Sequence, residues 1–392
     1  MEPLRFEMNQ VKDGIMPSAS IMGIEKVSRA SAFFKSIPLY RQTPLYCLPE
    51  MAAYLGVASI YVKDESRRFG LNAFKALGGA YAMARYIAQK AGAGDIDWDT
   101  LISDEVRGKV GSVTFFTATD GNHGRGVAWA ASKLRQKSVV YMPAGSTQHR
   151  LQRIRNEGAD ASITDLNYDD AVRLASEHAA NTPGGVVVQD TAWEGYEEIP
   201  RWIMQGYGVM AAEADRQMGV PPTHILVQAG VGSLAGAITG FFTNLYPNAK
   251  PKIGVVEASN YDCLYRSALA GQIRRLGGHP GTIMAGLACG EPNTIAWDIL
   301  HDHADCFISA PDYMAVQGMR MYSSPLGTDP RVISGESGAV TLGVLAHAML
   351  NMKILRTKFG LDEHSRVLLF STEGDTDPQR YLDIVWGNEV KL

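Results

Sequence analysis

Hydrophobic residues along the chain alternate between short continuous runs and longer segments with a helical period. The clearest series of apolar runs lies at 113–119, 138–144, 161–166 and 186–190. The amphipathic stretches that separate them predict helices at 127–136, 147–158 and from 169 onward. Runs of this length predict buried strands, and strands that alternate with helices predict a parallel sheet.

A second series begins after a helical segment at 197–218. It has apolar runs at 223–230 and 252–259, and a buried strand that runs into a loop at 366–377. Its helices are one that ends at 245 and one at 334–352. An earlier pair, a β-rich run at 59–63 and a helix at 76–91, belongs to the same series. We therefore expect an α/β fold with two doubly wound parallel-sheet domains and ligand chemistry in the crevice between them. The expected large domain is 1–88 plus 195–392, and the small domain is 89–194.

Three other stretches lack this alternation. Residues 1–42 are expected to be an irregular arm with short helices, 92–112 a polar linker, and 260–330 a loop-rich block with several short helices.

Composition excludes several classes of protein. The chain has 392 residues, 46% of them hydrophobic, and a net charge of −4, so nothing indicates a nucleic-acid partner. No apolar run reaches the roughly 20 residues of a membrane span, and MEPLRFEMNQVKDG lacks the apolar core of a secretory leader. The four cysteines show no metal-type spacing. We expect a cytoplasmic enzyme with mostly reduced cysteines.

Lys75 lies where a turn-rich stretch meets a predicted helix, in FGLNAFKALGG. An amine near the positive end of a helix has a lowered pKa and can form a Schiff base with an aldehyde. The alternative is an ordinary amphipathic helix start.

Two polar loops follow strands of the first series. In TATDGNHGRG, residues 117–126, backbone amides at a helix N-terminus suit a substrate carboxylate. Asp120 would oppose an anion there, so it is expected to attract a cation, move a proton or cap the helix. His123 is expected to be structural. Asp190, in VVQDTAWEG, is a second candidate carboxylate or a turn residue.

Two more loops follow strands of the second series. Gly230 and Gly232 in AGVGSLAG allow backbone amides to approach a phosphate, but with Glu257 they also fit a dinucleotide fingerprint. Ser371 or Thr372 in FSTEGDTD offers a hydroxyl to a ring nitrogen, or is a turn hydroxyl.

Taken together, these motifs resemble the fold-type II pyridoxal-phosphate enzymes, the threonine dehydratase and tryptophan synthase β family. The order Asn-Ala-Phe-Lys, Asp-Gly-Asn-His-Gly, Gly-rich loop and Ser/Thr covers nearly the whole chain. Within that family the chain is most similar to the diaminopropionate ammonia-lyases, through FGLNAFKALGG, TATDGNHGRGVAWAA, QDTAWEGYEEIP and FSTEGDTDP. Dehydratases usually have Ser or Thr where this chain has Asp120, which favours the ammonia-lyases.

The resemblance implies a set of cofactor and substrate contacts. Lys75, beside Phe74, would hold the cofactor aldehyde, Asn122 would contact its phenolic oxygen, and Ser371, rather than Thr372, would face the pyridine nitrogen. A phosphate cup would consist of Gly230, Val231, Gly232, Ser233 and Leu234. Glu336 would lie near the ring. Substrate contacts would come from Thr119, Asp120, Gly121, Asn122, His123 and Asp190.

The implied reaction is elimination from D- and L-2,3-diaminopropionate, giving pyruvate and two ammonia. Lys75 would take the α-proton from the L-isomer and Asp120 from the D-isomer, while Asp120 and Asp190 would bind the β-ammonium. The family also implies a homodimer. Three alternatives are a serine/threonine dehydratase, a nicotinamide-dependent dehydrogenase built on AGVGSLAG and Glu257, and a non-catalytic amino-acid sensor.

Two further clusters are given structural interpretations. His301, Asp302, His303 and Asp305 have the composition of a metal site, but a solvated helix end is expected and no metal is assigned. Cys263 and Cys289 lie in the loop-rich block and could form a disulfide that restrains a lid, which the expected reducing compartment disfavours.

Overall fold

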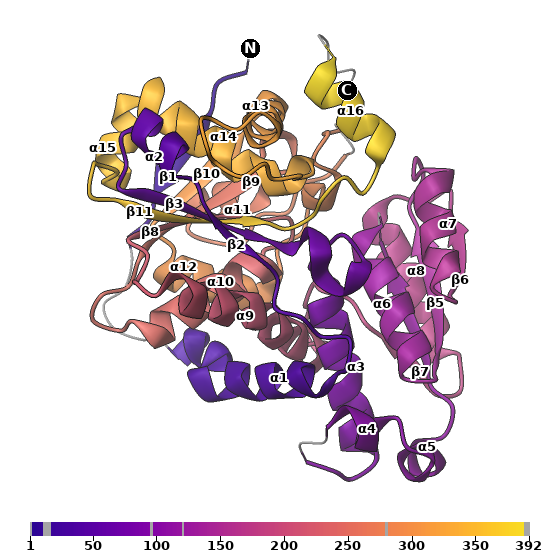
Figure 1. The fold of residues 1–392 in the computed structure, drawn as a ribbon. Helices are drawn as coiled ribbons and strands as arrows, with labels where there is room; N and C mark the ends of the chain where they lie inside the picture. The colour runs from indigo at the N-terminus through magenta and orange to yellow at the C-terminus, as the bar shows by residue number, and fades with distance from the viewer. Residues whose placement is uncertain (1, 11–16, 95–96, 120, 279–280, 388–392) are drawn as a thin grey trace. The chain divides into compact units, whose positions relative to one another are not determined.

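The computed structural model describes residues 2–10, 17–94, 97–119, 121–278 and 281–387, and it divides into two compact units (Figure 1). Unit 1 comprises Met1–Ile24, Gln42–Ala73 and Met210–Leu392, and unit 2 comprises Glu25–Arg41 and Phe74–Val209. The expected division into 1–88 plus 195–392 and 89–194 stays a prediction. The compact units differ from it by placing 25–41, 74–88 and 195–209 with the four-stranded sheet.

Unit 2 is built on a four-stranded sheet in the order β6-β5-β4-β7, with every pairing parallel. Its strands are β4 (Thr114–Ala118), β5 (Lys137–Met142), β6 (Asp160–Ile163) and β7 (Gly185–Val187). The helices between them are α6 (Asn122–Lys133), α7 (Gln148–Asn156) and α8 (Tyr168–Ala180). The expected alternation of strands and helices is confirmed here, because four short apolar runs need helices on both faces to be buried.

Unit 2 also contains α1 (Ile24–Ser36) from Glu25 onward, α3 (Ala76–Lys90), and the first part of α9 (Glu198–Met218). The polar stretch expected to be a linker, 92–112, holds two short helices, α4 (Trp98–Leu101) and α5 (Asp104–Val110). Asp97 and Ser103 cap them by accepting from backbone amides. The polar composition of this stretch did not indicate helices, because their start depends on the capping side chains and not on a hydrophobic pattern.

Unit 1 is built on a seven-stranded sheet in the order β1-β10-β9-β8-β11-β3-β2. Its strands are β1 (Arg5–Met8), β2 (Leu45–Cys47), β3 (Ser59–Asp64), β8 (His224–Gln228), β9 (Lys252–Ala258), β10 (Cys306–Ala310) and β11 (Arg366–Ser371). The five central strands are parallel, and β1 and β2 pair antiparallel at the edges. The expected parallel sheet is confirmed. The sequence did not predict β1, β2 or β10, which have only three to five residues each.

Helices of unit 1 pack on both faces of this sheet, and some, such as α13 and α16, pack mainly on other helices (Figure 1). They are η1 (Pro17–Met22), α2 (Pro49–Leu55), η2 (Glu65–Gly70), the rest of α9, α10 (Ser233–Leu245), η3 (Ser259–Tyr261), α11 (Cys263–Ala270), η4 (Ala285–Leu287), α12 (Thr294–His303), α13 (Asp312–Ser323), α14 (Glu336–Leu350), α15 (Lys353–Phe359) and α16 (Pro378–Trp386). Helix α14 is buried nearly all round, which explains its continuous apolar sequence.

Two glycines allow α13 and α14 to pack closely. A Cβ atom at Gly318 would lie 2.0 Å from the carbonyl oxygen of Ala339, and one at Gly343 would lie 2.0 Å from that of Met314. Among the described helices, no single one is long and apolar enough to cross a membrane. Helices α14 and α15 meet that criterion only as a pair, and the pair is bent by 104°.

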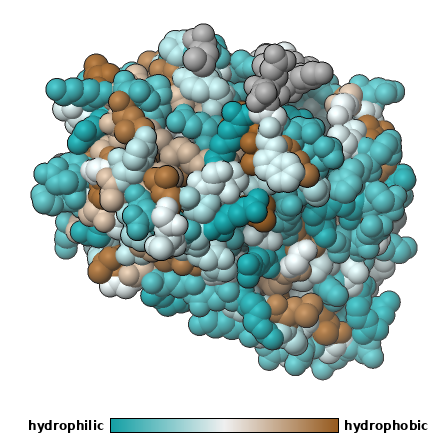
Figure 2. Space-filling view, turned by 45° about the horizontal axis from the view of Figure 1, so that its top comes forward, coloured by the Kyte–Doolittle hydropathy of each residue, from teal (hydrophilic) through white to brown (hydrophobic). Residues whose placement is uncertain are grey.

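Hydrophobic side chains at the surface are scattered. On the face shown in Figure 2 they form separate spots among hydrophilic residues. The most exposed large hydrophobic side chain among the described residues is Trp386, at 75%.

Candidate active site

Lys75 directly precedes α3, in the N-cap position, with helical backbone angles (φ −55°, ψ −26°). Two close packing contacts hold the backbone here. A Cβ atom at Gly126 of α6 would lie 2.9 Å from Cα and N of Ala76, and one at Gly78 would lie 2.6 Å from side-chain atoms of Ile203 and Tyr207 on α9. The small residues of FKALGG and of GRG thus allow α6 and α9 to approach the first turn of α3.

The amine of Lys75 donates a hydrogen bond to Oδ2 of Asp190. Asp190 follows β7, and its side chain is 4% exposed, whereas that of Lys75 is 22% exposed. Burial acts to raise the pKa of Asp190, but the positive charges of Lys75 and then His123 outweigh it and lower the pKa to about 2. Asp190 is therefore an ionised carboxylate beside a partly accessible amine.

Aromatic residues surround this ion pair. Tyr207 donates to Oδ2 of Asp190 at 3.4 Å, and burial raises the pKa of Tyr207, so its hydroxyl keeps its proton. The ring of Phe74 lies 4.7 Å from the ring of Tyr207, centroid to centroid, and the Lys75 amine lies 5.7 Å from the Phe74 centroid. Sequence reasoning missed Tyr207, because nothing in the helical stretch 197–218 distinguishes it from a core aromatic residue.

The segment that carries Asp190 is fixed by buried hydrogen bonds. Tyr196 Oη accepts from the backbone amide of Gln189 at 2.7 Å, and the Gln189 side chain accepts from Thr117 Oγ1 at 2.8 Å and from the amide of Ala118 at 3.1 Å. His123 contacts the carbonyl of Val188 through Nε2 at 2.8 Å. This contact gives His123 a structural partner, and its role at the substrate stays a prediction.

The loop after β4 leads directly into α6. Thr119 Oγ1 accepts from the amide of Gly121 at 2.9 Å, and Asn122 is the first residue of α6. A Cβ atom at Gly124 would lie 2.3 Å from Cγ2 of Thr119, so the helix and the loop are in close contact. Asp120 lies outside the described residues.

In unit 1, the Gly-rich loop joins β8 to α10. Gly232 occupies the N-cap position with φ +101°, a left-handed conformation that favours glycine. A Cβ atom at Gly230 would lie 3.1 Å from both Sγ of Cys289 and the carbonyl oxygen of Gly286. Asn293 braces the loop: its backbone amide donates to the Val231 carbonyl at 2.7 Å and its side chain to Ser233 Oγ at 2.8 Å.

Both candidate hydroxyls at the end of β11 are buried, but they differ in their partners. Thr372 Oγ1 accepts from Gln228 Nε2 at 2.7 Å. Ser371 is 0% exposed, and within the described part of the chain its Oγ has no hydrogen-bond partner. A buried polar atom without a protein partner is costly, so it suits a group that bonds to a ligand.

Glu336, the first residue of α14, accepts from Arg380 Nε at 2.9 Å, and its side chain is 12% exposed. Its proposed position near a cofactor ring stays a prediction, and this ion pair gives its charge another partner.

The comparisons with known proteins identify the family. The pyridoxal-phosphate dependent enzyme family matches residues 37–368. The chain belongs to the pyridoxal-phosphate-dependent enzymes. It is 52% identical over 363 residues to a diaminopropionate ammonia-lyase of Escherichia coli (strain K12), which covers 91% of this chain and 90% of that protein.

Solved structures agree with this assignment. The holo diaminopropionate ammonia lyase from Escherichia coli matches with a TM-score of 0.92 and 47% identity, covering 99% of this chain and 97% of that one. The same enzyme in complex with D-serine matches with a TM-score of 0.91 and 46% identity, covering 99% and 98%.

The chain of this pyridoxal-phosphate-dependent enzyme fits its cofactor on two observations. In the loop at 230–234, a Cβ atom at Gly230 would make tight contacts of 3.1 Å, and Gly232 has a left-handed conformation, as expected where backbone amides approach a phosphate. The Ser371 hydroxyl supplies a buried polar atom whose bonding capacity the described protein does not use.

Membership of this family overturns the alternative of a nicotinamide-dependent dehydrogenase. The structure shows that Glu257, the acid that completed the dinucleotide fingerprint, has another role. Glu257 is 0% exposed and accepts from the amides of Leu264 at 2.8 Å and Tyr265 at 2.7 Å. Burial raises its pKa to about 8, although these bonds act to lower it. This carboxyl group caps α11.

The remaining sequence clusters have structural partners. Asp302 accepts from Ser18 at 2.7 Å, and Asp305 pairs with Lys250 at 2.6 Å. In the described residues, no group of three or more His, Cys, Asp and Glu could hold a metal ion. None of the four cysteines, all of which are described, forms a disulfide.

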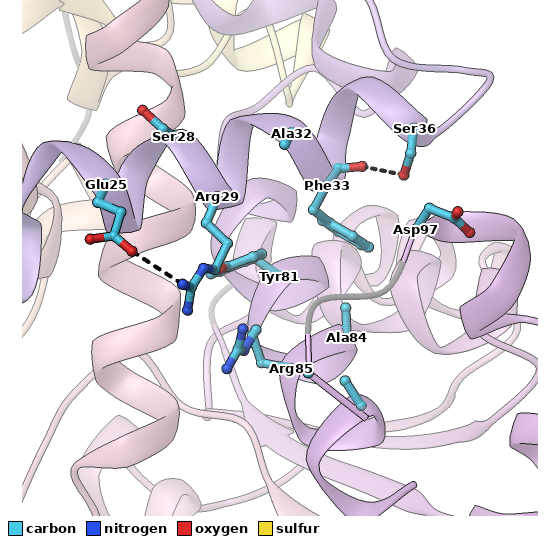
Figure 3. A pocket seen from close by; sticks show the side chains of 12 residues that line it. Glu25, Ser28, Arg29, Ala32, Phe33, Ser36, Tyr81, Ala84, Arg85 and Asp97 are labelled. Carbon is cyan, nitrogen blue, oxygen red and sulfur yellow. Dashed lines mark hydrogen bonds and ion pairs between the residues drawn. The ribbon is translucent and has the colours of Figure 1, made fainter. Parts of the chain in front are cut away.

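A cavity of about 450 Å³ lies elsewhere in unit 2, between α1 and α3 (Figure 3). Phe33 and Tyr81 lie along it, with Arg29 and Arg85 beside them. The predicted site residues of the described chain are not among those that line it. We therefore do not propose this cavity as the site of the chemistry.

Proposed function

We propose that the chain catalyses the α,β-elimination of 2,3-diaminopropionate, with pyridoxal phosphate, to pyruvate and two ammonia. Identity of 52% to an ammonia-lyase of that name, over 91% of the chain, carries the proposal. The reaction balances when one water is consumed. Bound pyridoxal phosphate supplies an electron sink that makes the α-proton of an amino acid acidic.

Each described site residue has a role in this proposal. Lys75 Nζ would hold the cofactor aldehyde and, once released, take the α-proton of the L-isomer. The amides and hydroxyl of Gly230, Val231, Gly232, Ser233 and Leu234 would hold the phosphate. Ser371 Oγ would donate to the pyridine nitrogen, and a neutral partner keeps that nitrogen largely unprotonated. Asn122 would contact the phenolic oxygen and Phe74 would pack beside Lys75.

Asp190 supports diaminopropionate as the substrate rather than serine. In the chain without cofactor, Asp190 accepts a hydrogen bond from the Lys75 ammonium, so the same carboxylate could hold a substrate β-ammonium once Lys75 holds the cofactor. A charge-assisted contact of this kind is worth about 1–3 kcal/mol. Serine and threonine lack that charge.

Asp120, although outside the described residues, enters the proposal through the sequence motif. It would take the α-proton from the D-isomer and help to bind the β-ammonium. Thr119, Gly121 and His123 belong to the same loop, whose amides would hold the substrate carboxylate. Asp120→Asn should then slow turnover of the D-isomer more than that of the L-isomer, and an equal loss would refute this assignment.

One assay tests the proposed function. The purified protein is mixed with D- and L-2,3-diaminopropionate and with serine, and pyruvate is measured. Diaminopropionate should be turned over much faster than serine, whereas a preference for serine would support the dehydratase alternative. Lys75→Ala should lose both turnover and the visible absorbance of the bound cofactor, and an unchanged spectrum would refute the role of Lys75.

Assembly and location form a separate part of the proposal. We expect a homodimer, as the family resemblance implies, and light scattering of the purified holoenzyme checks it. A cytoplasmic location is supported by four cysteines that form no disulfide in the described chain.

A further inference from the structure

Helix α11, whose first turn is buried, begins without the usual N-cap bond. Its N-cap residue, Asp262, makes no side-chain cap bond. The Asp262 carboxylate accepts instead from Arg5 at 2.9 Å, from Ser309 at 2.9 Å and from Arg266 at 2.7 Å. The first-turn amides of α11 therefore need another acceptor.

Glu257 is that acceptor, although it lies on a different element. From β9, its Oε1 accepts from the Leu264 amide and its Oε2 from the Tyr265 amide, at 2.8 and 2.7 Å. The Cys263 thiol also points at Oε1, at 3.6 Å. One buried carboxyl group thus fixes three successive residues of the first turn.

The first turn of α11 packs directly behind the Gly-rich loop. A Cβ atom at Gly232 would lie 3.3 Å from Cδ1 of Leu264, a side chain that is fully buried. Cys263 contacts the carbonyl of Cys289 at 3.6 Å, and Sγ of Cys289 lies 3.1 Å from the Cβ position of Gly230. Gly230 therefore contacts Cys289, which Cys263 holds, and Gly232 contacts Leu264, so both glycines depend on the first turn of α11.

We propose that Glu257 is a positioning residue for the cofactor phosphate: by fixing the first turn of α11, it sets the shape of the loop at 230–234. The inference rests on the proposed function, in which this loop holds the phosphate. Glu257 itself touches neither cofactor nor substrate in this scheme. Its effect should therefore depend on whether the ligand carries a phosphate.

The test compares two ligands. Glu257→Gln keeps the shape of the side chain but turns an NH₂ group toward one of the two amides, because both carboxyl oxygens are acceptors. Dissociation constants for pyridoxal 5'-phosphate and for pyridoxal are measured by absorbance titration after the cofactor is removed. We expect the constant for pyridoxal 5'-phosphate to rise at least about tenfold, as is typical for residues that orient a binding shell. The dissociation constant for pyridoxal should change less than about twofold, because pyridoxal has no phosphate group to contact the loop at 230–234.

Asp329 provides a matched control. It is 6% exposed, and its two carboxylate oxygens accept from the amides of Glu50 at 3.0 Å and Met51 at 2.8 Å, in the first turn of α2. Helix α2 packs on β3 and α14. Asp329→Asn should lower stability in a similar way but leave both dissociation constants unchanged.

The outcomes separate this inference from the proposed function. If the wild-type protein binds no pyridoxal 5'-phosphate, the proposed function fails. If it binds and Glu257→Gln has the wild-type constant, or weakens both ligands equally, only the positioning role is overturned. If Glu257→Gln does not fold, Leu264→Val takes its place, because it shortens the side chain that contacts Gly232. Leu264→Val should also weaken binding of pyridoxal 5'-phosphate more than binding of pyridoxal. An unchanged dissociation constant for pyridoxal 5'-phosphate in this variant would overturn the positioning role.

Discussion

Replacing Gly126 by alanine tests how the fold places Lys75. The added methyl group would lie 2.9 Å from Cα and N of Ala76 and 3.2 Å from the carbonyl carbon of Lys75. Carbon atoms in contact normally lie about 3.5–4.0 Å apart. These neighbours are backbone atoms, so the start of α3 must move away from α6 by about 0.5–1 Å to restore that separation.

Two effects on stability oppose each other in this variant. Alanine is preferred to glycine in a helix interior by about 1 kcal/mol, whereas overpacking a buried contact costs about 1–3 kcal/mol. The free energy of unfolding should therefore fall by no more than about 2 kcal/mol. The effect on catalysis should be larger, because a misplacement of about 1 Å at a reacting group can reduce turnover about 100-fold.

The assay combines urea unfolding with turnover of 2,3-diaminopropionate by the reconstituted holoenzyme. Gly79→Ala is the matched control, since Gly79 lies inside α3 and its Cβ position is 3.4 Å from Cγ2 of Val127, an ordinary contact. That control should be as stable as the wild type or more so, with normal turnover. Wild-type turnover in Gly126→Ala would show that the position of Lys75 does not depend on this contact.

Three further predictions concern other parts of the chain. In cofactor-free protein, the depressed pKa of Asp190 adds about 2 kcal/mol to the free energy of unfolding above pH 3.8, and this contribution is lost as the pH falls toward 2. In Asp190→Asn, the free energy of unfolding, measured by urea titration, should therefore depend less on pH between about 4 and 2. Arg68→Met leaves two buried carboxylates, Glu65 and Glu213, with Lys63 as the cation that remains in the described cluster; urea unfolding should show a loss of about 3–5 kcal/mol. Gly318→Ala should lower the melting temperature, measured by calorimetry, because its methyl group meets the Ala339 carbonyl; an unchanged value would contradict the close packing of α13 and α14.

The sequence was sufficient for the parallel sheets because their strands are buried on both faces. Continuous apolar runs such as 113–119 and 223–230 have no other stable place in an α/β protein. The strands that it did not predict, β1, β2 and β10, are short, and β1 carries polar residues at Arg5 and Glu7. Their pairing depends on neighbours that are distant in the chain, such as Phe6 beside Ile308.

Contacts between distant residues set the limit for the site as well. The motif around Lys75 indicated a reactive amine, but its contact with Asp190, 115 positions away, needed the fold. The same is true of Tyr207, which joins the ion pair from the middle of α9, and of Gly126, whose role is to leave space beside Ala76. A helical pattern predicts which face of a helix is buried and not which residue meets a charge.

Asp190 and Glu257 show why an acidic residue at the end of a parallel strand does not by itself define a function. Both are buried, and both follow or end an apolar run. Asp190 faces the ammonium of Lys75, which holds its pKa near 2, so it carries a charge that can bind a cation. Glu257 is fully buried and faces backbone amides and a thiol, and both of its oxygens are used to cap α11, although burial raises its pKa to about 8. The spacing in the sequence also fits Glu257 to a dinucleotide fingerprint, but the groups that surround each carboxyl make Asp190 the better candidate for binding a cation.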